Sequence, residues 1–355
     1  MGSEVTLKHV AEAAKVSPTT VSNFLNGHGS RMSPRTRKRV MRVIDELGYR
    51  PSRVARQLRT GRAQVLGLVV PSVANPFWGS FALAVEAEAL RRQQQVLLCN
   101  SERDLEREKA YVEELWASGV KAVVLGSSLP SLDYLAPILE RGLRVIAFDR
   151  ERQPGDPETL VSVSVDSVLG GRLVTQHLLE LGHRRIGFVS GPIATVSRRG
   201  RLAGYREALK LAGVRFRRQL VWDNVGSGFG DVQSAELGRR GMEALLTLPD
   251  PPTAVVAIND MYAIGACAAI RDAGLDVPGI AVAGFDDIVI ARLYNPPLTT
   301  VRQPLQEMVR FIFDTIDDEA TGRHQKTSRS MVMAPELIVR ASTALPITPS
   351  SVVRR

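Results

Sequence analysis

Apolar residues near the N-terminus recur every three or four positions, the spacing of a helix that packs on one face. The first such stretch follows Thr6, a favourable N-cap, and ends near Lys15. Its inward positions are Leu7, Val10, Ala11 and Ala14. Another stretch, introduced by a serine-proline pair, covers residues 35–47. Together with the stretch between them, they predict a small three-helix unit.

The middle stretch begins at Ser17 and Pro18, where a capping hydroxyl precedes a proline in the first helical turn. Its apolar residues Val21, Phe24 and Leu25 face the small core. The outward positions carry short, uncharged polar side chains: Thr19, Thr20, Ser22, Asn23 and Asn26. Two short helices around a tight turn predict a helix-turn-helix, whose polar face suits base edges and phosphates. A merely solvated helix face is the alternative.

Net charge separates these two interpretations. Residues 1–62 contain 13 Lys or Arg against 4 Asp or Glu, while the whole chain has 46 against 37. The remaining residues are therefore neutral, with 33 of each sign, and the whole excess of +9 lies at one end. A basic excess confined to a terminal domain is typical of a polyanion binder. We therefore expect the helix-turn-helix to bind DNA.

From Val65 onward, short apolar runs alternate with amphipathic stretches. The first repeat contains the predicted strands VLGLVV, QVLLCN, KAVVLGS and RVIAFD. The second begins with a helix at 170–181 and continues through RRIGFVSG, AVVAIND and IAVAGFD. Strands that alternate with helices form a parallel sheet covered on both faces. Two such repeats predict two α/β lobes with a cleft between them.

Polar and aromatic residues stand directly after the predicted strands, where open α/β sheets bind their ligands. These candidates include Phe77, Trp78, Asp149, Asn259 and Asp286. An aspartate at a strand end can instead cap the next helix. We expect that capping role for Asp260 and Asp287.

Several segments, taken in order, resemble the lactose/galactose repressor (LacI/GalR) family of bacterial transcription factors. In the N-terminal part they are VSPTTVSNFLNG and MSPRTRKRVMRVIDELGYRPSRVARQLRTG. Farther along they are LGLVVPSVANPFW, VDSVLGGRLVTQHLLELGHRRIGFVSG, SRRGRLAGYREAL, AIND and VAGFDDIVIARLYNPPLTTVRQP. The resemblance extends to Thr343.

The resemblance implies the fold and the domain boundaries. An all-α helix-turn-helix headpiece at 1–49 and a hinge at 50–62 would precede a two-lobed, periplasmic-binding-protein-like α/β effector domain at 63–345. The lobes would comprise about 63–164 with 293–324 (N-lobe), and about 165–292 with 325–343 (C-lobe). The tail at 346–355 would be disordered. Because it has no heptad of leucines, we expect a dimer rather than a tetramer.

The resemblance also implies the function. We expect a ligand-responsive, sequence-specific repressor that binds a near-palindromic operator as a homodimer and is controlled by a small metabolite between the lobes. A sugar is the first expectation for this effector. A purine or another metabolite, and an activator in place of a repressor, are the alternatives. The effector would change the angle between the lobes, in either direction of response.

DNA contacts are implied for one set of headpiece and hinge residues. They are Thr6, Ser17, Pro18, Thr19, Thr20, Ser22, Asn23, Asn26, Tyr49, Arg53, Ala55 and Leu58. In the family the hinge folds on operator DNA, where two copies meet and wedge a leucine into the minor groove. Leu58 matches that leucine, and Ala55 matches the small residue between the two hinge helices. The alternative is that Leu58 packs on the next domain.

Effector contacts are implied for residues of the cleft. They are Phe77 and Trp78, by ring stacking, and Asp149, Thr195, Ser197, Arg201, Asn259 and Asp286. Arg201 with Asp286 would clamp vicinal hydroxyls or a purine edge. The alternatives are a surface ion pair for Arg201 and a core position for Phe77.

Two positions depart from the family pattern. Asn23 stands where many members carry arginine in the recognition helix, which favours adenine or phosphate over guanine. Thr195 stands where purine-responsive relatives carry an arginine, which favours a sugar or another polyol as the effector. The operator half-site and the effector are therefore the two features on which this chain should differ.

Other classes of protein fit the sequence less well. No apolar run reaches membrane-spanning length, and the N-terminus passes directly into a polar, capped helix. We therefore expect a cytoplasmic bacterial protein, associated with the nucleoid when bound to DNA, rather than a periplasmic sugar-binding protein. Cys99 and Cys267 lie apart in apolar settings and should be buried, reduced thiols. The histidines have no metal-ligand spacing, and no catalytic constellation is evident, so we expect no metal, cofactor or enzymatic activity.

Overall fold

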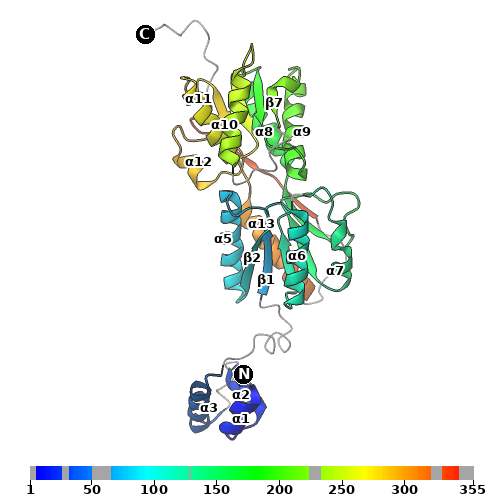
Figure 1. Ribbon diagram of the computed structural model, residues 1–355, viewed down its shortest axis with the longest axis vertical. Helices are drawn as coiled ribbons and strands as arrows, with labels where there is room; N and C mark the ends of the chain where they lie inside the picture. Colours follow the sequence, from blue (N-terminus) through cyan, green and yellow to red (C-terminus); the bar gives the residue numbers. More distant parts are fainter. Residues whose placement is uncertain are drawn as a thin grey trace. The chain divides into compact units, whose positions relative to one another are not determined.

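The computed structural model describes residues 5–25, 32–49, 65–127, 129–223, 233–320 and 330–343. It divides the chain into two compact units, 1–62 and 63–355 (Figure 1). Asn26, the predicted hinge with Arg53, Ala55 and Leu58, and the tail at 346–355 lie outside the described residues.

The first unit contains three helices whose ends follow from their capping residues. They are α1 (Leu7–Ala13), α2 (Pro18–Leu25) and α3 (Pro34–Leu47). Ser17 Oγ accepts the backbone N–H of Thr20 at 3.1 Å, and Ser33 Oγ accepts that of Thr36 at 3.2 Å. Gly48, in the left-handed conformation, ends α3. Helix α1 has Thr6 as its N-cap, as expected, but ends two residues before Lys15.

One apolar cluster holds these helices together. Val10, Ala14, Val21 and Val40 are fully buried in it. Phe24 and Leu25 pack against the cluster, as the periodicity of α2 predicts. The packing directs Thr19 and Asn23 of α2 to the surface.

In the second unit, the N-lobe is built on a parallel sheet in the order β11-β5-β4-β3-β1-β2. The strands are β1 (Val65–Val70), β2 (Gln95–Asn100), β3 (Ala122–Leu125), β4 (Arg144–Phe148), β5 (Val161–Val165) and β11 (Ser330–Met333). Alternate residues face opposite sides: Leu68 packs with helices α5 (Pro76–Arg91) and α13 (Leu305–Ala320), and Val69 with α6 (Leu105–Ala117) and α7 (Ala136–Glu140). Burial on both faces explains the unbroken apolar runs in the sequence.

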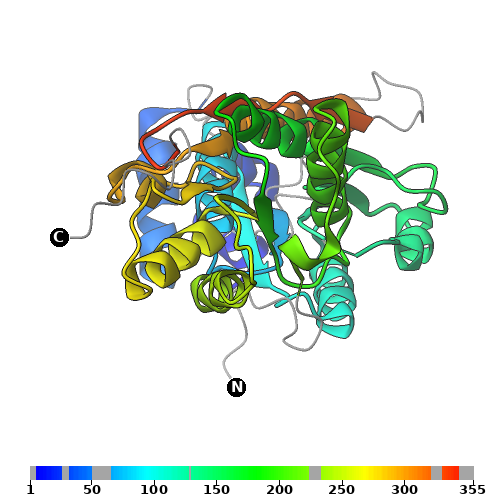
Figure 2. The same cartoon turned by 90° about the horizontal axis from the view of Figure 1, so that it is seen from above.

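The C-lobe has a smaller parallel sheet in the order β7-β6-β8-β9. Its strands are β6 (Ile186–Val189), β7 (Val221–Trp222), β8 (Ala254–Ala257) and β9 (Ala281–Ala283). The helices are α8 (Ser167–Glu180), α9 (Val196–Leu211), α10 (Ser234–Leu246), α11 (Asp260–Asp272) and α12 (Val289–Leu293). Figure 2 shows the α8/α9 and α10/α11 pairs on opposite sides of this sheet. Helix α10 was not among the predicted elements.

Glycine allows α8 and α9 to pack with their backbones in contact. A Cβ at Gly171 would lie 2.2 Å from the carbonyl oxygen of Arg201, and one at Gly204 would lie 1.9 Å from that of Val168. Neither distance is tolerable between backbone and side chain. The position of α9 is therefore fixed against α8.

Three crossings join the lobes, after β5, after β9 and after β11. The second contains β10 (Thr300–Arg302) and the third β12 (Glu336–Ile338), which pair antiparallel. Backbone bonds tie the crossings together, such as Asp166 N–H to Met333 O and Asp286 N–H to Val301 O, both 2.8 Å. Among the described residues, no helix is long and apolar enough to span a bilayer.

One lobe assignment from the sequence is wrong. Residues 330–333 form β11, which pairs with β5 in the N-lobe sheet rather than belonging to the C-lobe. The segment is short and half-exposed, and its partner strand lies more than a hundred residues earlier, so local periodicity carries no signal for it. The cysteines also differ from each other, since Cys267 is buried and Cys99 only half-buried.

Candidate functional site

A polar cavity lies between the two lobes of the second unit. Its volume is about 350 Å³, including the part that opens to solvent. The N-lobe contributes Asn75, Phe77, Trp78, Arg103 and Asp149. The C-lobe contributes Thr195, Ser197, Arg198, Arg201, Ile258, Asn259 and Asp286. The structure thus brings together all eight residues predicted for the effector site, and it adds Asn75, Arg103, Arg198 and Ile258.

Three helices begin at this cavity because each follows a strand that ends there. Asn75 caps α5, Thr195 caps α9 and Asn259 caps α11, each accepting a backbone N–H of its own first turn at 3.0–3.1 Å. Thr195 is almost fully buried, and its hydroxyl is used by the cap. Its contribution to the site is therefore mainly to position α9.

Two capping roles expected from the sequence are wrong. Asp260 does not cap α11. Its carboxylate accepts the hydroxyl of Thr300 and the backbone N–H of Ile288, both from the segment that crosses between the lobes. Asp287 instead forms ion pairs with Arg302 and Arg340.

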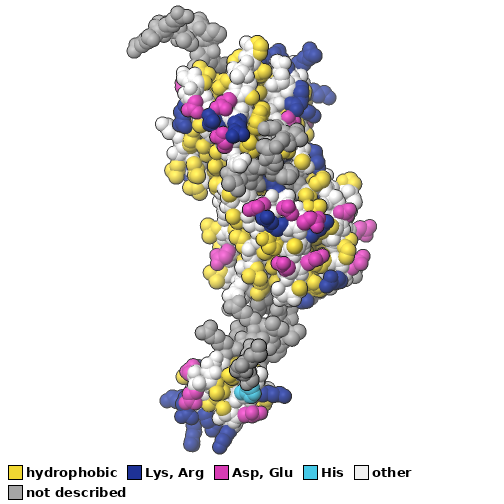
Figure 3. All heavy atoms as spheres, in the orientation of Figure 1, with side chains coloured by type: hydrophobic (Ala, Val, Ile, Leu, Met, Phe, Trp, Pro, Cys, Tyr) yellow, Lys and Arg dark blue, Asp and Glu magenta, His cyan; other side chains and the backbone are white. Residues whose placement is uncertain are grey.

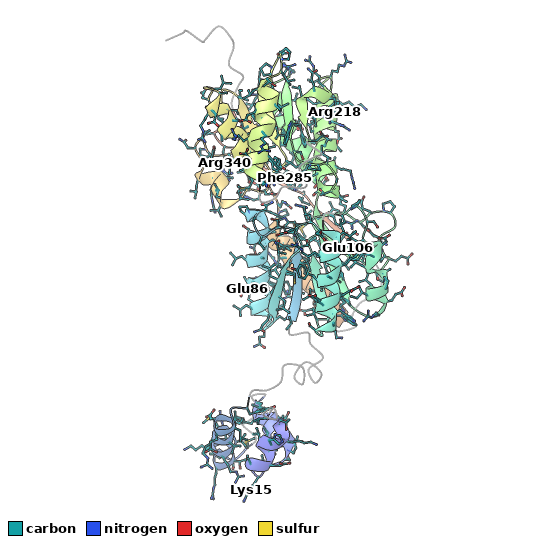
Figure 4. The ribbon with its side chains drawn as sticks, in the orientation of Figure 1. Lys15, Glu86, Glu106, Arg218, Phe285 and Arg340 are labelled. Atoms are coloured by element: carbon teal, nitrogen blue, oxygen red, sulfur yellow. The ribbon has the colours of Figure 1, made fainter. Side chains whose placement is uncertain are left out.

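Arg201 lies at the floor of the cavity and is 7% exposed. Its Nη1 donates to the carbonyl oxygen of Ile258 at 2.6 Å, and its guanidinium carbon lies 3.6 Å from the centre of the Phe285 ring. Figure 4 shows Phe285 where the two lobes meet. The Nε atom is buried and has no hydrogen-bond partner among the described residues. This burial excludes the surface ion pair considered for Arg201.

Asp286 is the anionic partner of Arg201. Its Oδ1 lies 3.7 Å from Arg201 Nη2 and accepts a hydrogen bond from Gln303 Nε2 at 2.8 Å. The backbone of Asp286 has φ of +107°, a conformation that side chains other than glycine adopt at a cost. The backbone bond to the neighbouring crossing, described above, holds it there.

Asp149 faces Ser197 across the cavity. The Ser197 hydroxyl donates to Asp149 Oδ2 at 3.4 Å, and the residue has a φ of +61°. Within the part of the chain that the structure describes, Asp149 Oδ1 is buried without a hydrogen-bond partner. Burial raises the pKa of the Asp149 carboxyl, and the positive charges of Arg201 and Arg103 oppose that rise.

The two aromatic residues are packed more tightly than ring stacking on an effector would require. Phe77 is 5% exposed and Trp78 2% exposed. Trp78 makes edge contacts with Phe77 and Phe148, at ring-centre distances of 5.4 and 5.8 Å. A Cβ at Gly126 would lie 2.5 Å from the Trp78 ring, so only glycine fits beside it. The predicted stacking stays a prediction, and core packing already uses most of both rings.

In the first unit, most predicted DNA contacts lie on one surface. Ser17, Pro18, Thr19 and Asn23 are exposed, whereas Thr20 and Ser22 are half-buried. The hydroxyls of Ser17 and Thr20 also bond each other at 2.8 Å. Figure 3 shows lysine and arginine side chains gathered on this unit, and Figure 4 shows Lys15 at its surface.

Tyr49 differs from the other predicted DNA contacts. It is 8% exposed and belongs to the apolar cluster of the first unit. Burial also raises the pKa of its hydroxyl. The structure thus gives Tyr49 a packing role, and its contact with DNA stays a prediction.

Known proteins resemble this chain over almost its whole length. Residues 6–52 match the family described as bacterial regulatory proteins, lacI family, and residues 175–343 match the periplasmic binding protein-like domain. The HTH-type transcriptional regulator DegA of Bacillus subtilis (strain 168) is 34% identical over 347 residues, which cover 96% of this chain and 98% of DegA.

Solved structures agree with this match. The transcriptional regulator CelR in complex with cellobiose is 34% identical, with a TM-score of 0.69, and the match covers 96% of this chain and 100% of CelR. The lac repressor dimer bound to operator and the anti-inducer ONPF is 28% identical, with a TM-score of 0.79 and coverage of 96% and 99%. Both domains of the chain are therefore matched in one continuous alignment.

Proposed function

Because this chain belongs to the LacI family of bacterial regulatory proteins, we propose that it represses transcription as a homodimer and senses a sugar or a related polyol. A DNA-binding transcriptional repressor regulated by an effector is the function of this family, and its members are not enzymes. The proposal adds the effector class, the residues that bind it and the assembly.

The cavity supports a polyol through two buried polar atoms. Arg201 Nε is a donor and Asp149 Oδ1 is an acceptor, and neither has a protein partner among the described residues. Leaving such a group unsatisfied costs about 1–3 kcal/mol. A hydroxyl both donates and accepts, so two neighbouring hydroxyls of a sugar satisfy both atoms. This pair of atoms is the observation that carries the proposal.

The same cavity gives less support to a purine. A purine base binds best to an exposed aromatic face, whereas Phe77 and Trp78 are almost fully buried against other rings. Thr195 also uses its hydroxyl to cap α9. The sugar therefore remains the preferred class.

The exposed apolar residues of the N-lobe support a dimer. Leu83 and Leu90 lie two turns apart on α5, and both are exposed. Leu97 and Leu98 are exposed on β2, the edge strand of the sheet. Exposed apolar patches of this kind typically mark protein interfaces. We propose that this face contacts a second copy of the chain.

In the proposed mechanism, two headpieces bind a near-palindromic operator at the bacterial nucleoid. Thr19 and Asn23 of α2 contact the major groove, and Leu58 of each hinge enters the minor groove between the half-sites. The effector changes the angle between the lobes. This change alters whether the two hinges can fold together on DNA, and ligand and operator affinities are thereby coupled.

The test needs an operator, which selection of bound genomic fragments by the full chain supplies. Affinity for that operator is then measured by fluorescence anisotropy with neutral sugars, sugar derivatives and nucleosides. We expect a sugar-type ligand to change the affinity, and Arg201→Lys to abolish the change while leaving ligand-free operator binding intact. Arg199→Lys, an exposed neighbour on α9, is the matched control. A response to a nucleoside base alone would refute the effector class.

A further inference from the structure

The charges that line the cavity do not balance. Three guanidinium groups, those of Arg103, Arg198 and Arg201, face two carboxylates, those of Asp149 and Asp286. Asp286 is the ion-pair partner of Arg201. The lining thus carries a net charge of +1, although a neutral sugar requires no excess of positive charge.

Arg198 is placed where a positive charge is unfavourable for the protein alone. It is 5% exposed and lies in the first turn of α9, next to the positive end of the helix dipole. The first turn of α9 contains no acidic residue. Two of the contacts of Arg198 are to neutral groups, with Nη1 donating to Pro192 O at 3.1 Å and the guanidinium carbon 5.9 Å from the Tyr262 ring centre. Burying a charge is costly unless an opposite charge accompanies it.

Backbone groups increase the positive potential of the cavity. Helices α5, α9 and α11 begin there, and their caps Asn75, Thr195 and Asn259 line it. Helix N-termini attract anions through their free N–H groups and their dipoles. Arg103 contributes from the opposite lobe, in the loop after β2 with a φ of +60°.

We propose that the effector is an anionic carbohydrate whose negative group binds between Arg103 of the N-lobe and Arg198 of the C-lobe. Its hydroxyls bind Arg201 and Asp149. This inference rests on the proposed role of the cavity as the effector site. The anionic group is a phosphate or a carboxylate, and either accepts hydrogen bonds from guanidinium groups. Because the two arginines come from different lobes, the anion also links the lobes.

The first experiment uses inorganic phosphate as the probe for the anion subsite. Thermal unfolding of the full chain is followed by tryptophan fluorescence, in phosphate and in sodium chloride of equal ionic strength. We expect phosphate to raise the unfolding temperature. Arg198→Gln and Arg103→Gln should weaken the apparent affinity about 10- to 100-fold, as expected for loss of a charge-assisted hydrogen bond. Arg199→Gln, which removes an exposed charge from the same helix, should keep the wild-type affinity.

The ligand-free variants separate binding from a structural role. If Arg198 serves the ligand, Arg198→Gln should unfold at the same temperature as the wild-type protein or higher. Unfolding at a clearly lower temperature, together with unchanged phosphate affinity, would assign Arg198 to structure and overturn the proposal. Failure of phosphate to stabilise the wild-type chain beyond sodium chloride would overturn it as well.

A second experiment distinguishes the source of the charge. Glucose 6-phosphate, gluconate and glucose are compared in the same assay, and we expect one of the two anionic compounds to bind more tightly than glucose. Tighter binding of glucose, equal in wild type and Arg198→Gln, would overturn the anionic effector but leave the polyol proposal standing. If Arg201→Lys changes the binding of no probe that the wild-type chain binds, the cavity itself has been misassigned.

Discussion

Replacing Gly204 by alanine should force α8 and α9 apart and destabilise the second unit. A Cβ at this position would lie 1.9 Å from the carbonyl oxygen of Val168 and 2.6 Å from the backbone nitrogen of Arg172. Both atoms belong to the backbone of α8, so rotation of a side chain cannot relieve the clash. The helices must separate or α9 must shift.

Two opposing effects determine the magnitude. Alanine favours the helix over glycine by about 1 kcal/mol. Overpacking of a closely packed site costs about 1–3 kcal/mol, and two backbone contacts this short place Gly204 at the upper end. The net expectation is a loss of about 2 kcal/mol in the free energy of unfolding. Because Arg201 lies one turn earlier on α9, effector affinity should fall as well.

Urea unfolding followed by tryptophan fluorescence measures this loss. The chain has 3 tryptophans, at positions 78, 116 and 222, all in the second unit, so the signal does not depend on the headpiece. Gly79→Ala is the matched control. Gly79 is exposed in α5, and a Cβ there meets no neighbouring described group within 4 Å, so a gain of up to about 1 kcal/mol is expected. A Gly204→Ala variant as stable as Gly79→Ala would refute the packing argument.

Other predictions concern DNA binding, the effector and pH. Leu58→Ala should weaken specific operator binding in anisotropy measurements without changing the circular dichroism spectrum, and unchanged affinity would remove the hinge assignment. Asn23→Arg should shift operator preference toward guanine in a binding-site selection, and an identical selected sequence would show that Asn23 contacts no base. Asp149→Asn should be more stable than wild type at neutral pH. Because burial raises the pKa of Asp149 above its ordinary value of 3.8, wild-type stability falls as pH rises from that value through the raised pKa, and the variant should lose this part of the pH dependence in urea titrations.

The parts of the fold that local sequence determines were predicted well. The Ser17 cap, the end of α3 at Gly48 and the alternation of strands and helices all depend on residues close in sequence. The cavity residues were found together because the ends of parallel strands meet at one edge of a sheet. That rule required no knowledge of side-chain contacts.

The missed features depend on segments that are distant in sequence. Asn259 and Asp260 are both good capping residues, and Thr300, forty positions later, engages the aspartate and leaves the asparagine as the cap. Arg103 and Arg198 lie in arginine-rich stretches where most side chains face solvent, so the sequence did not show that they line the cavity. The unusual arginine in the first turn of a helix was the one signal that Arg198 offered.

The crossing at Asp286 makes the effector site also the pivot of the lobes. Asp286 lines the cavity and is bonded through its backbone to Val301 of the adjacent crossing, so a ligand there acts at the short arm of a lever. The long arm is β1, whose 6 residues carry the chain about 20 Å from its entry at Val65 to the cavity. A lobe rotation of roughly 5°, smaller than the rotations of about 15° known in allosteric proteins, would move Val65 by about 2 Å. In a dimer the displacement occurs twice and in opposite directions, so a sub-ångström adjustment around one small molecule is amplified into several ångströms between the two points where the hinges begin.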